Sequence, residues 1–390
     1  MSTDQQDPAQ YQNQLDNKIA KYRLSMEQAG VDITEITVHR SAPLGFRMRA
    51  EFRVWHQDGQ VFYAMNRPGE KRPYIIHDFP IGAPLIGKTM PLLLQALNSS
   101  AILSRKCFSA EFLTTSSGQV LITLIYHRPL DSEWEAQARA LQDRLGLSII
   151  GRSRKQKVVL DKDYVTEQLN IEGRNYSYQQ VESGFTQPNA GINCQMLEWS
   201  SKQLAGSSDD LLELYCGNGN FTAVLAQHFN QVLATEISKV SVNSALTNFA
   251  ANQVDNVKVV RMSSEEFTQA LNKQRPFRRL ADIDLESYKF STIFVDPPRA
   301  GLDSETEKLV SRFDNILYIS CNPETLASNL SQITQTHNIE SVAVFDQFPW
   351  TDHLESGVLL KMFVGWDSSG RVISAMPQTT SISCTVGPST

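Results

Sequence analysis

The spacing of apolar residues changes twice along the chain. Residues 7–30 carry apolar side chains at close to helical spacing and predict one helix, with Tyr11, Leu15, Ile19 and Leu24 on its apolar side. From about residue 35, apolar and polar residues alternate around Asp58-Gly59 and Ser117-Gly118, which predicts antiparallel hairpins. From about residue 176, short apolar runs alternate with helical stretches, a pattern typical of βαβ units and a mostly parallel sheet.

These changes divide the chain into four predicted segments. We predict an N-terminal helical segment over 1–34 that packs on the C-terminal domain, and an α+β antiparallel domain over 35–175. Residues 176–365 are expected to form an α/β Rossmann-like domain. The segment 366–390 is rich in Ser, Thr, Pro and Gly, and we predict that it is disordered.

Composition narrows the class of protein. A chain of 390 residues with 41% hydrophobic content is long enough for two domains with full cores. No run of about 18 apolar residues predicts a membrane span, and the polar N-terminus does not resemble a secretory signal, so we expect a cytoplasmic protein. The five cysteines are scattered without a CxxC pair, which argues against zinc, iron–sulfur clusters and disulfides: Cys107, Cys194, Cys216, Cys321 and Cys384.

Charge is unevenly distributed along the sequence. The net charge of −6 by itself argues against a nucleic-acid partner. Residues 37–73, however, hold seven Lys/Arg against three acids, and Arg152, Arg154, Lys155 and Lys157 form a second cluster. These clusters predict either a local nucleic-acid surface or simply the solvated face of a sheet.

A Gly-containing turn marks a candidate nucleotide site. In "LELYCGNGNF", Gly217 and Gly219 follow a predicted strand and open a helix, where the backbone can approach a ligand closely. Glu236 ends the next strand, 17 residues after Gly219, and an acid there suits a ribose diol. The distal glycine of the dinucleotide fingerprint is absent, which favours S-adenosylmethionine over a dinucleotide. The alternative interpretation is a purely structural turn.

Two further strand ends add candidate chemistry. Asp296 in "FVDPPRAGL" and Cys321 in "YISCNPETL" end consecutive predicted strands, so in a parallel sheet both face one crevice. The helix that begins near Pro323 is expected to lower the pKa of the Cys321 thiol and favour the thiolate. The alternatives are a helix-capping aspartate and a buried cysteine that acts only as a small hydrophobe.

A nucleophilic cysteine and a base suit methylation of uracil at C5. Thiolate addition to C6 makes C5 enolate-like, and the C5 proton must then leave to a base. In "FPWTDHLESGVLL", Glu355 is the candidate base and His353 an orienting residue or RNA contact, although either residue could be structural.

Six motifs in order resemble the RNA uracil-5 methyltransferase family: "FTQPN", "LELYCGNGNF", "ATEIS", "FVDPPRAGL", "YISCNPETL" and "FPWTDHLESGV". The resemblance implies that 176–365 is the methyltransferase domain, with Cys321 as nucleophile and Glu355 as proton acceptor. It implies S-adenosylmethionine contacts from Gln187, Tyr215, Asn220, Glu236 and Asp296, with Phe185 shaping the pocket. It also places an RNA-binding domain at 35–175, with contacts from Arg47, Arg49, Arg53 and Phe108, and a further contact from His353.

The front half resembles the tRNA branch of this family. The implied reaction methylates the T-loop uridine of tRNA, and we extend the prediction to tRNA-like RNAs with a T-arm and to a monomer without metal. The front cysteine cluster of iron–sulfur members and a leading barrel domain are both missing, which favours tRNA. Alternatives are a ribosomal-RNA uracil-5 methyltransferase, a DNA or protein amino-methyltransferase, and an RNA-binding or RNA-folding protein whose methylation is secondary.

Overall fold

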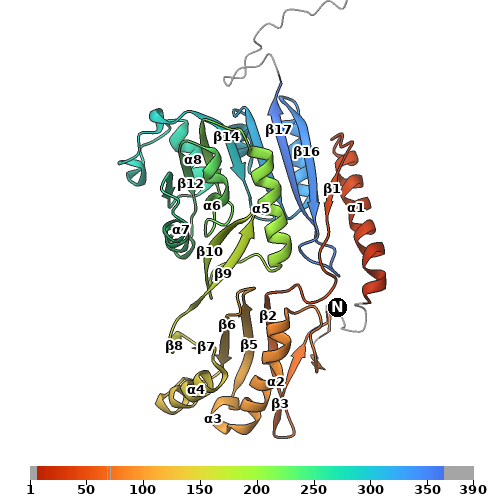
Figure 1. Cartoon of the computed structure of the whole chain (residues 1–390), viewed down its shortest axis with the longest axis vertical. Coiled ribbons are helices and arrows are strands. Elements are labelled where there is room, and N and C mark those ends of the chain that lie inside the picture. Colours follow the sequence, from red (N-terminus) through yellow and green to blue (C-terminus); the bar gives the residue numbers. More distant parts are fainter. Residues whose placement is uncertain (1–6, 68, 71, 364–390) are drawn as a thin grey trace, which may run out of the picture.

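The protein consists of a larger and a smaller body joined at a narrow waist (Figure 1). The structure is a computed structural model and describes residues 7–67, 69–70 and 72–363. Residues 1–6 of the predicted N-terminal segment, Lys71 of the first basic cluster and the predicted tail at 366–390 lie outside the described residues.

The larger body is built on an eight-stranded sheet. Its strands lie in the order β1 (Thr37–His39), β16 (His337–Phe345), β17 (Glu355–Met362), β15 (Asn315–Ser320), β14 (Phe290–Val295), β11 (Asp210–Leu214), β12 (Val232–Thr235) and β13 (Val257–Val260). All neighbours pair in parallel except β17, which is antiparallel to both β15 and β16. The predicted α/β Rossmann-like fold with a mostly parallel sheet is confirmed.

Helices cover both faces of this sheet because its strands are apolar on both sides. In β14, Ile293 and Val295 point to one core, whereas Phe294 between them points to the other. The first core includes α1 (Tyr11–Gln28), α8 (Ser264–Leu271), α9 (Ser304–Val310) and α10 (Pro323–Ile333). The second includes α5 (Ala190–Leu204), α6 (Thr222–Leu225) and α7 (Lys239–Ala251), together with the hairpin of β9 (Tyr164–Ile171) and β10 (Arg174–Val181).

The smaller body has a seven-stranded sheet with its own core. Its strand order is β4 (Tyr74–Ile76), β3 (Gln60–Met65), β2 (Arg49–Gln57), β5 (Cys107–Thr114), β6 (Val120–Tyr126), β7 (Ser148–Ser153) and β8 (Gln156–Val159). Only β6 and β7 are parallel. Helices α2 (Pro84–Ser99), α3 (Ala101–Ser104) and α4 (Ser132–Leu145) pack on it. The predicted turn at Asp58-Gly59 has positive φ at both residues, 51° and 77°, as a tight two-residue hairpin requires.

Some segments do not follow the predicted ranges. Residues 37–39 fall within the predicted 35–175 segment, yet they form β1 and pair with β16 of the larger sheet. The helix expected after the Gly-containing turn is only four residues of α6, followed by the 3₁₀ turn η3 (Ala226–His228). The other 3₁₀ turns are η2 (Pro8–Gln10), η4 (Arg278–Leu280) and η5 (Leu285–Ser287). In the described part of the chain, no helix is long and apolar enough to cross a membrane. The division into domains with separate roles stays a prediction.

Candidate active site

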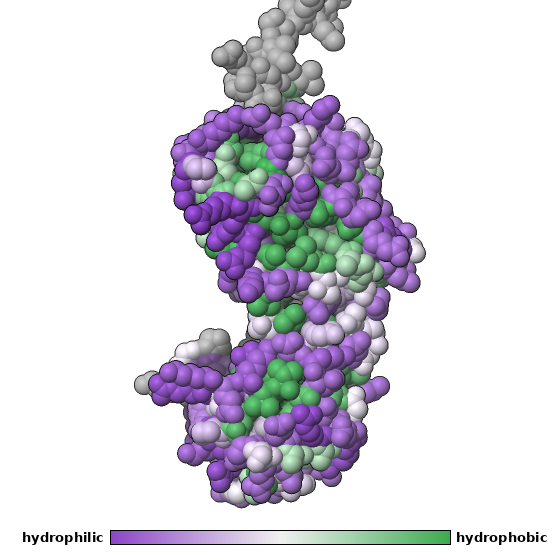
Figure 2. All heavy atoms as spheres, turned by 90° about the vertical axis from the view of Figure 1, so that its left-hand side faces the viewer, coloured by the Kyte–Doolittle hydropathy of each residue, from purple (hydrophilic) through white to green (hydrophobic). Residues whose placement is uncertain are grey.

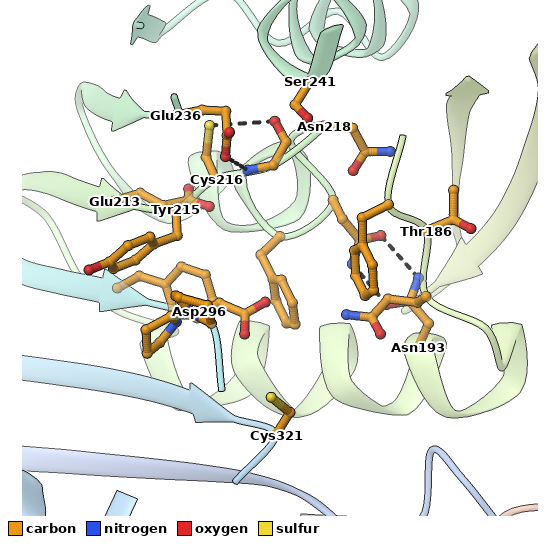
Figure 3. Close-up of a pocket in the computed structure, with 18 of the residues that line it drawn as sticks. Thr186, Asn193, Glu213, Tyr215, Cys216, Asn218, Glu236, Ser241, Asp296 and Cys321 are labelled. Atoms are coloured by element: carbon orange, nitrogen blue, oxygen red, sulfur yellow. Dashed lines mark hydrogen bonds between the residues drawn. The ribbon is translucent and has the colours of Figure 1, made fainter. Parts of the chain in front are cut away.

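A cavity of about 540 Å³ opens at the carboxyl ends of the central strands, where open α/β sheets bind their ligands. Residues that are distant in sequence meet here: Glu213 lies near the end of β11 and Tyr215 follows it, Glu236 follows β12, Asp296 follows β14 and Cys321 follows β15 (Figure 3). Its volume is that of a pocket for one small-molecule ligand. The predicted convergence of Asp296 and Cys321 follows from the parallel pairing of β14 with β15.

The turn after β11 shapes one wall of the cavity. Tyr215 adopts a left-handed backbone conformation with φ of 64°, and Gly217 follows with φ of 57°. The Glu236 carboxylate accepts hydrogen bonds from the Gly217 amide at 3.1 Å and the Ser238 amide at 2.6 Å. A Cβ at Gly219 would lie 2.6 Å from the ring of Phe249 in α7, and its φ is 77°, so packing and backbone conformation by themselves require a glycine here.

All five predicted cofactor contacts line this cavity: Gln187, Tyr215, Asn220, Glu236 and Asp296. Three of their side chains are oriented by partners that sequence reasoning missed. Asn220 exchanges two amide hydrogen bonds with Asn193 of α5, at 2.8 and 3.0 Å. The Gln187 amide oxygen accepts from Gln347 at 2.7 Å, and the Tyr215 hydroxyl donates to Ser264 at 2.6 Å.

Apolar side chains form the rim of the cavity. Figure 2 shows apolar residues gathered on one face of the larger body and at the waist between the bodies. Phe185 and Ile237 line the cavity although they are 73% and 66% exposed. Large exposed apolar side chains at the mouth of a pocket are typical of a ligand-binding surface. Phe185, predicted to shape the pocket, is therefore one of its lining residues.

Two buried carboxyl groups, Glu213 and Glu355, share this cavity with the half-buried Asp296. Burial raises the pKa of Glu213 to about 8 and the pKa of Asp296 to about 7. Burial, and then the neighbouring Asp296, raise the pKa of Glu355 to about 8. Clustered buried acids favour a positively charged ligand, because a cation offsets both the lost solvation and the mutual repulsion. Glu213 is part of the motif "LELYCGNGNF", but no role is predicted for it from the sequence because it lies within a predicted buried strand.

The thiol of Cys321 is not activated in the predicted way. Burial, followed by the charges of Glu355 and Asp296, raises the pKa of Cys321 to about 11, and Arg299 opposes this only weakly. The expected lowering by the start of α10 is wrong for this structure because the nearby amides are engaged elsewhere. The Asn322 amide donates to Ser320, the Glu324 amide donates to the Asn322 side chain, and Pro323 has no N–H.

His353 lies outside the cavity, in the loop before β17. Its ring Nδ1 is 3.2 Å from a guanidinium nitrogen of Arg299, which does line the cavity. Burial, and then the charge of Arg299, lower the pKa of His353. Glu355, the first residue of β17, lines the cavity together with Cys321.

Apart from His353, the predicted RNA contacts lie in and next to the smaller body. The Arg53 guanidinium lies 5.3 Å from the ring centre of Phe108 and 5.5 Å from that of Trp55, and His127 stacks on Phe108 at 4.3 Å. Arg49 instead donates to the carbonyls of Glu182 and Gly184.

Other basic residues also have contacts within the protein, through the backbone or through ion pairs. The Arg47 backbone forms bridges to Gly82 and Asn189. In the second basic cluster, Arg152 and Lys157 both pair with Glu182. Arg53 has no acidic partner among the residues that the structure describes.

The donor set fits S-adenosylmethionine. Acidic side chains are present for its cationic centre and for its ribose hydroxyls, and apolar residues can cover the adenine. In the described part of the chain, no group of three or more His, Cys, Asp and Glu side chains is arranged to hold a metal ion. Fold and cavity thus define an S-adenosylmethionine-dependent methyltransferase.

Comparison with known proteins gives the family. A family model described as tRNA (Uracil-5-)-methyltransferase matches residues 10–363. The chain is 56% identical over 353 residues to a tRNA/tmRNA (uracil-C(5))-methyltransferase of Cellvibrio japonicus, covering 90% of this chain and 96% of that protein. It is 54% identical over 360 residues to the protein of the same name from Saccharophagus degradans, covering 91% and 98%. The chain therefore belongs to the tRNA (uracil-5-)-methyltransferase family.

A solved structure supports the same fold. The crystal structure of Pyrococcus abyssi tRNA (uracil-54, C5)-methyltransferase with S-adenosyl-L-homocysteine superposes with a TM-score of 0.66, covering 90% of this chain and 83% of that one. The two sequences are 21% identical, so this similarity is one of fold.

Proposed function

We propose that the protein transfers a methyl group from S-adenosylmethionine to C5 of the T-loop uridine of tRNA through a covalent adduct between Cys321 and C6. One observation carries this proposal: Cys321 and Glu355 line the same cavity as all five predicted cofactor contacts. A nucleophile, a base and a methyl-donor site are thereby brought around one substrate position. The names of the relatives also describe uracil-C5 methylation of tRNA and tmRNA.

The residues divide the chemistry between them. The Cys321 sulfur forms a bond to C6, and the electrons of the C5–C6 double bond move towards O4, so that C5 becomes nucleophilic. S-adenosylmethionine supplies the methyl group that C5 accepts. The Glu355 carboxylate then takes the C5 proton, the C5–C6 double bond re-forms, and the thiolate leaves C6.

The raised pKa of the Cys321 thiol is consistent with the proposed reaction. A thiol that is held protonated in the free enzyme is protected from adventitious reaction. The acids that raise its pKa also favour a cation, and the positive charge of S-adenosylmethionine would lower the pKa of every acid in the cavity. Cys321 would therefore gain nucleophilic thiolate character only with the cofactor in place.

The smaller body is proposed to hold the T-arm of the tRNA. A base stacked in its loop cannot offer C6 to a sulfur and C5 to a methyl donor, so the target uridine must be flipped into the cavity. Arg53 beside Phe108, Trp55 and His127 joins a cation to aromatic rings, the combination that binds phosphates and unstacked bases.

Arg53→Gln tests this RNA surface. We expect the KM for tRNA to rise while kcat changes little, since Arg53 is not part of the cavity. The slope of log affinity against log salt should fall by about one, as for the loss of one phosphate contact. Lys258→Gln, at an exposed cation on the edge strand β13, is the control and should change neither quantity. An unchanged KM and slope in Arg53→Gln would remove Arg53 from the RNA surface.

Labelled methyl transfer tests the function as a whole. The protein is incubated with methyl-labelled S-adenosylmethionine and an unmodified tRNA transcript, and the labelled nucleoside is identified and mapped. We expect 5-methyluridine in the T-loop. Label on ribosomal RNA instead of tRNA would keep the chemistry and overturn the substrate, and no label on either would overturn the proposal.

The remaining predictions extend this proposal. We infer that the enzyme also acts on tRNA-like RNAs with a T-arm, and the naming of its relatives as tRNA/tmRNA methyltransferases supports this. We further propose that it works as a monomer in the cytoplasm, where its substrate is found. Gel filtration of the enzyme alone and with tRNA checks the oligomeric state.

A further inference from the structure

A lysine lies in the middle of the apolar stripe of helix α1. The buried positions of this helix recur at helical spacing: Tyr11, Leu15, Lys18, Tyr22 and Met26. Lys18 is only 3% exposed, and its pKa is lowered by burial. A lysine is almost never fully buried unless it is paired. The partners of the Lys18 ammonium group therefore indicate its structural role.

Both partners of Lys18 belong to the loop between β16 and β17. The ammonium nitrogen is 2.6 Å from a carboxylate oxygen of Asp346 and 2.8 Å from the carbonyl oxygen of Phe348. Asp346 is itself 0% exposed and directly follows Phe345, the last residue of β16. Phe345 is the cross-strand partner of Glu355. The ion pair is thus one residue away from the partner of the proposed base.

Other contacts of α1 reach the same loop. Gln14 donates to the carbonyl oxygen of Thr351 at 2.7 Å, and the ring of Tyr11 packs edge-on against Trp350 at 6.0 Å. Trp350 has a φ of 65°, a conformation that bulky residues rarely adopt, and its indole N–H donates to Pro43 at 2.7 Å. A loop held in an unfavourable backbone conformation requires fixed neighbours to keep it there.

We propose that Lys18 is a positioning residue for the removal of the C5 proton, because it fixes the loop 346–354 that leads into Glu355. This inference rests on the proposed function. Cys321 is held differently, by β15 and by the Ser320 and Asn322 side chains at the start of α10. Ser320, next to Cys321, also pairs with Ser356, next to Glu355, but the Lys18 contact reaches only the loop on the Glu355 side. Loss of the Lys18 contact is therefore expected to act more on the base than on the nucleophile.

The test variant removes both buried charges together. Lys18→Met with Asp346→Asn avoids leaving an uncompensated carboxylate in the core. With uridine tRNA we expect turnover to fall on the order of 10²-fold, as for a displaced catalytic group. The covalent enzyme–RNA complex should accumulate, since the methylated adduct cannot lose its proton. The melting temperature of the double variant and its affinity for S-adenosylhomocysteine are also measured, to verify that the variant is folded.

A substrate without a C5 proton separates positioning from general damage. In tRNA containing 5-fluorouridine, the adduct forms and accepts the methyl group but has no proton for Glu355 to remove. We expect the double variant to form this trapped complex at a rate within about twofold of the wild type, because Cys321 is little affected. Lys18→Arg, which keeps a charged donor, should recover most of the turnover on uridine tRNA.

Two variants on the same helix are controls. Lys21→Met removes an exposed ion pair to Asp352 of the same loop, and Met26→Ala weakens the buried stripe of α1 outside the loop contacts. Neither should change the ratio of trapping rate to turnover. The proposal is overturned if the double variant turns over uridine tRNA at the wild-type rate, or if trapping and turnover fall equally. Failure of the proposed function itself would be visible separately, as a wild-type enzyme that traps no 5-fluorouridine tRNA.

Discussion

Replacement of Cys321 by serine is expected to abolish methylation of tRNA. An alkoxide is not available at neutral pH to attack C6, and without that attack C5 cannot accept a methyl group. Turnover should fall by at least roughly 10⁴-fold, which corresponds to about 5.5 kcal/mol of lost barrier reduction. Label transfer from S-adenosylmethionine to tRNA measures this loss directly.

The Cys321→Ser variant should still bind tRNA. Cys321 is half-buried at the edge of the cavity, and serine is slightly smaller, so neither the cofactor site nor the RNA surface is disturbed. We expect the tRNA dissociation constant to stay within about threefold of the wild type. Cys194→Ser, at a cysteine outside the cavity lining, is the matched control and should keep normal turnover. Methylation by Cys321→Ser at the normal rate would refute the adduct and favour an amino-methyltransferase, whose chemistry requires no cysteine.

Replacement of Glu355 by glutamine is expected to stop the reaction at a later point. Glutamine keeps the shape of the side chain but cannot take the C5 proton, and loss of such a base costs roughly 10²–10⁴-fold in rate. Because attack and methyl transfer come before this step, a covalent enzyme–tRNA complex should accumulate and be visible on a denaturing gel. Equal loss of the complex and of turnover would mean that Glu355 does not act after the adduct has formed.

The pH dependence gives Glu355 a second signature. Its raised pKa, about 8 in the free enzyme, means that the carboxyl must ionise before it can act, so kcat/KM should increase with pH towards that value. Because the folded state binds this proton more tightly than the unfolded state, the raised pKa stabilises the fold at low pH. That stabilisation is lost as the pH rises through the folded-state pKa. Glu355→Gln lacks this titration, so its melting temperature relative to the wild type should increase with pH. A constant difference would contradict the raised pKa.

The sequence was informative where chemistry follows from strand order. Asp296 and Cys321 could be placed together because the ends of neighbouring parallel strands face one crevice. The turn at Asp58-Gly59 could be predicted because few residues adopt positive φ. Both inferences use local patterns and one general rule of sheet geometry.

Contacts between distant segments could not be predicted in this way. Nothing near Lys18 in the sequence indicates a carboxylate 328 positions further on, and nothing near Asn220 indicates Asn193. Arg49 and Arg53 are equivalent in a count of charges, yet one holds the carbonyls of residues 182 and 184 and the other lies beside aromatic rings. The thiol pKa was misjudged because burial and two neighbouring acids outweigh a helix start whose amides are occupied.

The position of β17 also determines when the protein becomes an enzyme during its synthesis. Among the described residues this strand is the last in sequence, but it lies inside the sheet, between β15 and β16, and it begins with Glu355. Within the part of the chain that the structure describes, β1 pairs with β16 alone, so the N-terminal part of the larger body also requires a C-terminal partner. Sequence-distant pairing of this kind delays folding. A nascent chain still lacking residues 355–362 therefore has a sheet with a missing inner strand and lacks the proposed base, so we expect it to be unable to modify tRNA.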